Sequence, residues 1–427
     1  MIDIKLIRED ARRISRQLKK RGIEVSFDDF LVIDNRRREL IQQSETLKHQ
    51  QNQANNRIKQ LRSEGRAIDE IVQEMRKIST MIKEIDVQLD EITNQFQEFL
   101  DSLPNIPDED VPPGGKENNI SLRQFREQPS FDFEIKDHVH LATELGLIDY
   151  ERGTKLGGTG SWIYYGIGAI LEWALVNYFV EEHLKDGYTF VLPPHILSYE
   201  CGYTAGQFPK FEDEVYMVNT TLGKQPQFLL PTSETALVNL FRDEIIPEDE
   251  LPKKFFSYTP CYRSESGSYR TSERGTIRGH QFNKVEMFQY TLPEKSDQAL
   301  DELLQKAEKL VKSLGLHYRT SLLAAEDMSF SMAKTYDVEV WIPSIGYKEV
   351  SSVSNARDYQ ARRGRIRFKR KETGENHYVH TLNGSGLATS RLIPAILEQF
   401  QRADQSVIVP EALRNWISVE VLNPNSV

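Results

Sequence analysis

Two stretches decide the fold of the larger part of this chain: TPCYRSE at 259–265 and RGHQFNKVE at 278–286. Each is predicted to hold the end of a β-strand, and the loop between them is rich in Gly, Ser and Arg, so the two form a hairpin. Arg263 and Arg278 lie near its two ends and could converge on a single anion. Because a guanidinium stays charged and can meet a carboxylate or phosphate with two hydrogen bonds, the hairpin predicts an anion-binding site.

Short β-rich runs alternate with amphipathic helices around this hairpin. We expect strands over 188–194, 214–218, 227–230, 254–261, 282–290, 317–322, 338–342, 347–351 and 378–383, and helices over 171–184, 234–243, 296–314 and 386–403. Because short loops join consecutive strands, these elements favour an antiparallel sheet flanked by helices. The sequence has neither G-x-G-x-x-G after a strand nor G-x-x-x-x-G-K-[ST], so no Rossmann or P-loop nucleotide site is indicated.

Two further polar segments lie downstream of the hairpin. Glu349-Val350-Ser351-Ser352 places a carboxylate and two hydroxyls on one predicted strand. Asn383-Gly384-Ser385-Gly386 leads from a strand to a helix that carries Arg391, and a glycine pair at a helix N-terminus lets the backbone approach a ligand closely. Each segment alone is a weak signal, because a single strand Arg or Glu is usually solvated and N-G-S-G is usually a turn.

A heptad repeat occupies the first third of the chain. Apolar residues follow one another at gaps that alternate between three and four: Ile68, Ile71, Met75, Ile78, Ile82, Ile85, Leu89, Ile92, Phe96 and Phe99. This spacing is typical of a coiled-coil seam. A matching repeat, with apolar residues every seven positions, lies upstream at Ile33, Leu40, Leu47, Ala54 and Leu61. Between the two repeats, Ser63-Glu64-Gly65-Arg66 predicts a turn. We therefore expect an antiparallel helical hairpin roughly 45 Å long, given the rise of about 1.5 Å per residue.

Basic residues crowd the first helix of this hairpin and its turn: Arg36, Arg37, Arg38, Lys48, Arg57, Lys59, Arg62 and Arg66. They lie off the seam and could meet phosphates, but Asp and Glu are also plentiful, so an ordinary solvated surface or a dimerisation rod is an open alternative. Prolines and glycines between 104 and 119 interrupt the helix. We place a helical N-terminal domain at 1–103, a linker at 104–119 and a second domain at 120–427.

Composition narrows the class of protein. The chain has 427 residues, 54 Lys and Arg against 64 Asp and Glu, and 39% apolar residues, which is typical of a globular protein without a global positive field. The most apolar stretch, 167–180, is too short to cross a bilayer, which requires ~20 residues. With only Cys201 and Cys261, a disulfide scaffold and an all-cysteine zinc site are excluded. No secretory signal is visible, so we expect a cytoplasmic protein.

Taken in this order, the segments resemble the class II aminoacyl-tRNA synthetases, and most closely the bacterial-type seryl-tRNA synthetases. Gly187 to Pro194 resembles motif 1, Tyr262 to Glu286 motif 2, and Gly384 to Arg391 motif 3. Pro231-Thr232-Ser233-Glu234 is similar to the family's serine-binding T-x-E loop. The resemblance implies an α+β fold, with an N-terminal antiparallel coiled-coil arm and an antiparallel catalytic sheet flanked by helices.

The resemblance also implies an activity. The family activates L-serine with ATP to seryl-adenylate and transfers serine to the 3′ end of serine tRNA, and in some members selenocysteine tRNA is charged as well. It implies ATP as substrate, Mg²⁺ as cofactor, no zinc, a homodimer formed through motif 1, and an arm that grips the long variable arm of the tRNA, with the acceptor end near motif 2. The alternative is a synthetase-derived paralogue that loads another acceptor or acts as a regulator.

Residue roles follow from the same resemblance. The implied catalytic residues are Arg263, Glu265, Arg278 and Arg391. The implied serine-binding residues are Thr232, Ser233, Glu234, Arg263, Glu286, Asn383 and Ser385. The implied ATP-binding residues are Arg263, Ser264, Glu265, Phe282, Glu349, Val350, Ser351, Ser352 and Arg391, of which Glu349 and Ser352 would hold the Mg²⁺ of the nucleotide. The implied tRNA-binding residues are Arg36, Arg37, Lys48, Arg57, Lys59 and Arg62.

Three departures from the family pattern are visible. Ser233 stands where alanine is usual, and Val353 where cysteine is common. The motif 2 loop, 266–274, has the family's length without its usual R-D-T wording. Because that loop meets the acceptor end of tRNA in class II enzymes, the departures concern transfer more than activation.

Overall fold

The computed structural model describes residues 1–218, 226–265 and 274–424, so most of the motif 2 loop lies outside the described residues. The chain divides into two compact units. One comprises Ile2–Lys19 and Ile23–Pro104, and the other comprises Met1, Lys20–Gly22 and the chain from Asn105 onward. Within the described ranges, every helix is too short or too polar to span a bilayer.

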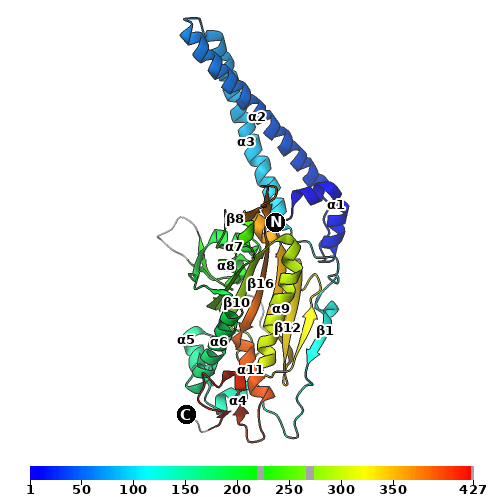
Figure 1. The fold of residues 1–427 in the computed structure, drawn as a ribbon, viewed down its shortest axis with the longest axis vertical. Helices are drawn as coiled ribbons and strands as arrows, with labels where there is room; N and C mark the ends of the chain where they lie inside the picture. Colours follow the sequence, from blue (N-terminus) through cyan, green and yellow to red (C-terminus); the bar gives the residue numbers. More distant parts are fainter. Residues whose placement is uncertain (219–225, 266–273, 425–427) are drawn as a thin grey trace. The chain divides into compact units, whose positions relative to one another are not determined.

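The first unit is a long helical hairpin preceded by a shorter helix. α1 (Ile4–Lys19) precedes α2 (Asp28–Ser63) and α3 (Asp69–Ser102), which pack against each other along the hairpin (Figure 1). All the predicted seam positions are buried or half-buried, which confirms the coiled-coil pattern. At the base, Phe30 stacks on Phe96 and Phe99 with ring centroids 5.1 and 4.4 Å apart. Aromatic pairs of this kind add about 0.5–1.5 kcal/mol each to the burial of their surface.

An eight-stranded sheet forms the centre of the second unit. Its order is β1 (Ile120–Phe125), β11 (Tyr318–Leu322), β12 (Lys334–Ile342), β13 (Gly346–Arg357), β16 (His380–Ala388), β10 (Gln281–Thr291), β9 (Lys253–Tyr262) and β4 (Thr189–Phe190). Every pairing is antiparallel except that of β4 with β9. The prediction of an antiparallel sheet flanked by helices is therefore confirmed.

The sheet is covered by α6 (Ile167–Lys185), α9 (Ser296–Ser313) and α11 (Thr389–Gln399), and α4 (His138–Glu144) packs on α11. α9 packs on β13 and β16, α6 on β10, and α11 on β10, β12 and β13, and Figure 1 shows α9 running along the strands. Apolar side chains from these helices and strands form one continuous buried core. The core holds β10, β13 and β16 in fixed positions, and these three strands carry half of the residues predicted to be catalytic or to bind serine or ATP.

Shorter elements surround the sheet. The strands are β2 (Ile148–Asp149), β3 (Ile163–Tyr164), β5 (Ile196–Ser198), β6 (Met217–Val218), β7 (Gln227–Leu229), β8 (Ile245–Pro247), β14 (Arg367–Lys369), β15 (Asn376–Tyr378), β17 (Val407–Ile408) and β18 (Val421–Leu422). The helices are α5 (Tyr150–Gly157), α7 (Tyr199–Ala205), α8 (Glu234–Leu237) and α10 (Tyr359–Arg363), together with single 3₁₀ turns at Lys116–Asn118, Glu212–Glu214, Glu248–Glu250, Pro293–Lys295 and Glu411–Leu413.

Two helix predictions were wrong in their bounds. The helix expected over 386–403 begins at Thr389, because β16 continues to Ala388, which pairs with Lys284 of β10. The glycines of motif 3 therefore lie on a strand and not at a helix N-terminus. The helix expected over 234–243 is only the four residues of α8, and the chain then turns to Asp243, whose φ of 68° is incompatible with a helix.

Candidate active site

The central strands bring several of the predicted residues to one place. Glu286 of β10 lies directly opposite Ser385 of β16, and Asn383 lies opposite Phe288 two residues further along the ladder. Side chains on a strand alternate between its two faces, so Phe282, Lys284 and Glu286 share one face of β10. Sequence-distant residues therefore meet because β10 and β16 are neighbours in the sheet.

Two buried carboxylates, Glu234 and Glu286, form what we call the acidic cluster. Asn383 links them, because its Nδ2 donates to Glu286 Oε1 at 3.0 Å and to Glu234 Oε2 at 3.2 Å. Ser385 Oγ donates to Glu286 Oε2 at 3.3 Å. Gln360, to which the sequence assigned no role in the site, donates to Glu234 Oε1 at 2.7 Å. Three neutral side chains, Asn383, Ser385 and Gln360, thus donate hydrogen bonds to the acidic cluster.

The acidic cluster changes the titration of Glu234. Burial, and then the negative charge of Glu286, raise the pKa of Glu234 to about 7, against the opposing effect of the Gln360 hydrogen bond. Glu234 therefore gains and loses its proton near neutral pH. A ligand with a positive charge would stabilise the carboxylate form.

Lys284 is a site residue that sequence reasoning missed. Its side chain is 8% exposed, and its Nζ lies 2.7 Å from Thr232 Oγ1 and 2.6 Å from Glu286 Oε2. The Lys284 ammonium thus balances one charge of the acidic cluster and joins it to Thr232. The signal was present in the sequence, because the alternation of a strand places residue 284 on the same face as Glu286.

Ser233, which replaces the usual alanine, is fully buried, and its Oγ has no hydrogen-bond partner among the described residues. Thr232 Oγ1 accepts from the Glu234 backbone N–H at 3.2 Å. The extra hydroxyl of Ser233 therefore makes no polar contact with the acidic cluster, and the residue beside it is fixed by Lys284 and the backbone.

A second group, which we call the arginine cluster, consists of Arg263, Glu349 and Arg391. Arg391 Nη1 donates to the Glu349 carbonyl at 2.8 Å and lies 3.4 Å from its carboxylate. The Arg263 guanidinium lies 5.1 Å from the centre of the Phe282 ring, and its Nε donates to the Pro231 carbonyl at 3.4 Å. The cluster therefore combines two permanent positive charges with one carboxylate beside an aromatic face.

Electrostatics join the two clusters. Burial acts to raise the pKa of Glu349, but the charges of Arg391 and Arg263 outweigh it, so the pKa is lowered and the group stays ionised. Arg263 also acts on Glu234. The pKa of nearby Asp337 shifts in the opposite direction. Burial and the charge of Glu349 raise it, although the Ser352 hydroxyl donates to Asp337 at 2.5 Å. One arginine therefore faces both clusters.

The remaining predicted residues contact the core or other parts of the chain. Val350 is 1% exposed and belongs to the apolar core, so only its backbone could face a ligand. Ser351 Oγ donates to the Ser385 carbonyl at 2.6 Å and supports β16. Ser264 Oγ donates to the Asp213 carbonyl at 2.7 Å, and Glu265 forms an ion pair with Arg278. The ion pair gives Arg278 a carboxylate partner inside the hairpin.

The basic residues of the arm differ in whether their charged groups contact other side chains. Arg37 packs its guanidinium 4.5 Å from the Phe96 ring, and Lys48 lies 3.1 Å from Asp86. The side chains of Arg57, Lys59 and Arg62 are exposed and form no ion pair within the ranges that the structure describes. The charges still available to an external anion are therefore concentrated toward the turn.

Comparison with known proteins shows which family the chain belongs to. Residues 216–400 match the tRNA synthetase class II core domain (G, H, P, S and T), and residues 1–107 match the seryl-tRNA synthetase N-terminal domain. The chain is 61% identical to serine–tRNA ligase 2 of Clostridium acetobutylicum over 425 residues, which is 99% of this chain and 100% of the relative. It is 43% identical to the serine–tRNA ligase of Thermodesulfovibrio yellowstonii over 428 residues, again with 99% and 100% covered.

A solved structure extends the likeness to three dimensions. The seryl-tRNA synthetase of Pyrococcus horikoshii, complexed with ATP, superposes with a TM-score of 0.90 at 30% identity and covers 99% of this chain and 100% of its own. Identity of this extent over the full length, together with both domain matches, leaves one assignment. The chain belongs to the seryl-tRNA synthetase family of class II aminoacyl-tRNA synthetases.

Proposed function

We propose that the acidic cluster binds serine and that the arginine cluster binds ATP. As a member of its family the protein is a serine–tRNA ligase, which uses ATP to join serine to tRNA. The observation that carries the assignment of the site is the place of Arg263, which lies beside the Phe282 ring and donates to the Pro231 carbonyl next to Thr232. Its charge, like that of Lys284, acts on both Glu234 and Glu349. A guanidinium of the arginine cluster that also acts on the acidic cluster can contact the serine carboxylate and the α-phosphate at the same time.

In this arrangement the serine carboxylate attacks the α-phosphorus of ATP, and pyrophosphate leaves. No covalent enzyme intermediate is needed, so the protein contributes position and charge neutralisation. Arg263 would draw the two anionic reactants together, while Phe282 stacks on one face of the adenine and Arg391 covers the other. Glu265 would then accept from the adenine amino group, and Arg278 would neutralise phosphate charge.

Glu349 and Ser352 fit a magnesium ion carried by the nucleotide. Both offer hard oxygen ligands, and Glu349 is held in its ionised form. Nucleotide-bound Mg²⁺ keeps several waters and takes only one or two protein ligands. The ion would neutralise phosphate oxygens when bound, while Arg391 holds Glu349 in place through its carbonyl.

Selection of serine would depend on its hydroxyl group. Glu286 and Ser385 would bond that hydroxyl, while Thr232 and Glu234 take the ammonium group. When alanine enters, these buried groups are left without a partner, and sites of this kind discriminate by ~10⁴ or more. Serine-dependent ATP–pyrophosphate exchange, with alanine and threonine as competitors, tests the assignment. Exchange that is equally fast with alanine would contradict it.

We expect the KM for serine to depend on the protonation of Glu234. The pKa of Glu234 is raised to about 7 by burial and by Glu286, so below that pH the empty site holds a neutral acid that binds ammonium poorly. The KM for serine should rise about tenfold per unit as pH falls below the pKa and level off above it. Exchange measured with saturating ATP between about pH 5.5 and 8.5 gives the profile. In Glu234→Gln this dependence should disappear at a higher KM.

We further propose that the arm binds the long variable arm of serine tRNA through the exposed cations near its turn, Arg57, Lys59 and Arg62. The family match over residues 1–107 supports this role, and recognition by backbone charge and shape suits a structured RNA. Charging of selenocysteine tRNA would follow from the same contacts. The cytoplasm, where tRNA is charged, is the location we propose.

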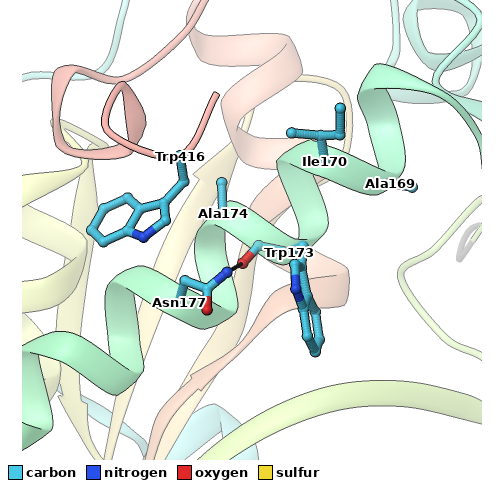
Figure 2. A pocket seen from close by; sticks show the side chains of 6 residues that line it. All are labelled: Ala169, Ile170, Trp173, Ala174, Asn177 and Trp416. Atoms are coloured by element: carbon cyan, nitrogen blue, oxygen red, sulfur yellow. Dashed lines mark hydrogen bonds between the residues drawn. The ribbon is translucent and has the colours of Figure 1, made fainter. Parts of the chain in front are cut away.

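We propose that the protein forms a homodimer through α6 and the motif 1 strand. A groove of about 250 Å³ lies on α6, lined by Ile170, Trp173 and Asn177 and bordered by Trp416. Figure 2 shows these side chains. Large apolar side chains are exposed on and beside this helix, with Ile170 at 47%, Trp173 at 52% and Leu192 at 70%. Apolar patches of this kind mark interaction sites, and a second copy is the partner that motif 1 predicts.

Ile170→Asp should shift the protein from dimer to monomer. A carboxylate on each side of a two-fold contact adds two charges to an apolar surface, and both lose their hydration when it closes. Light scattering after size exclusion measures the mass. Val87→Asp is the matched control, because Val87 is 59% exposed but lies on the arm. A monomeric wild-type protein, or a dimeric Ile170→Asp variant, would count against this interface.

A further inference from the structure

Glu172 is a buried acid in the middle of α6 that no step of the proposed reaction uses. It is 4% exposed, and one of its oxygens, Oε1, accepts two hydrogen bonds. Thr389 Oγ1 donates to it at 2.5 Å, and Asn283 Nδ2 donates at 2.8 Å. A single carboxylate oxygen therefore joins α6 to two segments that come from elsewhere in the chain.

Both partners stand next to residues of the proposed ATP site. Thr389 is the first residue of α11, and Arg391 follows in its first turn. Asn283 lies between Phe282 and Lys284 on β10. Thr389 Oγ1 also lies 3.2 Å from the Asn283 carbonyl. The beginning of α11 and the middle of β10 are thus fixed relative to each other at this point.

The Glu172 carboxylate orients the side-chain amide of Asn283. Nδ2 of Asn283 donates to Glu172 at 2.8 Å, and its Oδ1 then accepts from the Tyr258 hydroxyl at 3.2 Å. A carboxylate accepts hydrogen bonds and donates none when ionised. Replacing Glu172 by an apolar residue would leave the Asn283 amide without its acceptor, and the Thr389 hydroxyl would keep only the Asn283 carbonyl at 3.2 Å.

We propose that Glu172 is a positioning residue for nucleotide binding, which holds Phe282 and Arg391 at the spacing that an adenine ring between them requires. The inference rests on the proposed function, because it assumes that these two side chains enclose the adenine. Glu172 itself touches neither substrate in this scheme. It acts through Asn283 on one face of the base and through Thr389 on the other.

Stability alone does not account for an acid at this position. Burial raises the pKa of Glu172 to about 7, although hydrogen bonds from Thr389 and Asn283 lower it. Its pKa therefore lies above the ordinary carboxyl value, and ionisation at neutral pH costs folding free energy. Replacing buried ionic groups by well-packed apolar residues is often neutral or stabilising. A hydrogen-bond acceptor at this position is better explained by the geometry that it imposes.

The test compares four variants in serine-dependent ATP–pyrophosphate exchange. Glu172→Ala removes the acceptor, Glu172→Gln retains Oε1, and Thr389→Val removes one donor with little change of shape. Leu175→Ala is the matched control, because Leu175 is fully buried on the same helix without a polar contact to the site. Each variant's KM for ATP, KM for serine and melting temperature are measured.

We expect Glu172→Ala to raise the KM for ATP about tenfold and to leave the KM for serine within about twofold. Glu172→Gln should stay within about threefold of wild type for ATP, and Thr389→Val should raise only the KM for ATP. The double variant Glu172→Ala/Thr389→Val should be no worse than its worse parent, because both act through one contact. Leu175→Ala should lower the melting temperature without separating the two KM values.

Wild-type KM values for ATP in a folded Glu172→Ala variant would overturn the proposal. So would an equal rise of both KM values, the pattern of a general loss of structure. If Glu172→Ala does not fold, Thr389→Val decides the matter, and an unchanged KM for ATP in that variant overturns the proposal. Failure of the proposed function is distinguishable, because then the wild-type protein itself shows no serine-dependent exchange.

Discussion

Arg263→Ala is expected to reduce serine-dependent ATP–pyrophosphate exchange by about 10²–10³-fold or more, the range found when one group that stabilises developing charge is removed. The reason is that Arg263 belongs to the arginine cluster and that its charge also acts on Glu234 of the acidic cluster. Two anions, the serine carboxylate and the α-phosphate, must approach each other for the reaction, and no other guanidinium acts on both Glu234 and Glu349 among the effects described above. Both kcat and the KM for serine should suffer.

Two variants serve as controls for this result. Arg263→Lys keeps the charge but loses the planar fork, so it should recover part of the activity. Arg365→Ala removes an exposed arginine that pairs with Asp243 at 2.5 Å, away from both clusters, and should leave exchange unchanged. Exchange by Arg263→Ala within about tenfold of wild type, with an unaltered melting temperature, would refute the role assigned to Arg263.

Shortening the arm should impair the charging of tRNA without impairing the activation of serine. Gln51 of α2 donates to Ser79 of α3 at 2.9 Å, so these residues face each other across the hairpin. Removing 53–77 and closing the helices with a short glycine turn deletes the exposed cations and retains the aromatic base. We expect kcat/KM for charging of serine tRNA to fall about 10²-fold, since phosphate contacts dominate such binding.

The same shortened variant contains its own control. Every residue proposed to bind serine or ATP lies in the second unit, so serine-dependent exchange should stay within about twofold of wild type. A finer variant, Arg57→Glu with Lys59→Glu and Arg62→Glu, should reproduce the loss of charging and reduce its dependence on salt. Undiminished charging by the shortened enzyme would remove the arm from tRNA recognition.

The arm was predictable because its pattern is local. A repeat of three and four residues places every seam side chain on one face of its own helix, whatever the rest of the chain does. The sheet was predictable in kind, since short loops between strands favour antiparallel pairing. The first residue of α11 was not predictable. The strand before it, β16, extends through Gly386 only by pairing with β10, which lies about a hundred residues away in the sequence.

Some residues of the site were predicted from the sequence, and others were found only in the structure. Arg263, Glu286 and Glu349 were named from motifs whose order is written in the sequence. Lys284 and Gln360 were missed, although both are buried against the acidic cluster. Strand alternation with Glu286 could have indicated Lys284, whereas Gln360 lies far from Glu234 in the sequence and only the fold brings it to that carboxylate.

The sequence alone determined the helical arm, the antiparallel class of the sheet and the family motifs, because heptad spacing and motif order depend on residues close together along the chain. The tertiary structure decided which charges face each other. Glu172 looks like one polar interruption in an apolar helix, and only the packing of α6 on β10 brings it to Asn283 and Thr389. Burial and pKa arise from atoms that the fold brings together, so the chemistry of Glu172 and Glu234 emerges only in three dimensions.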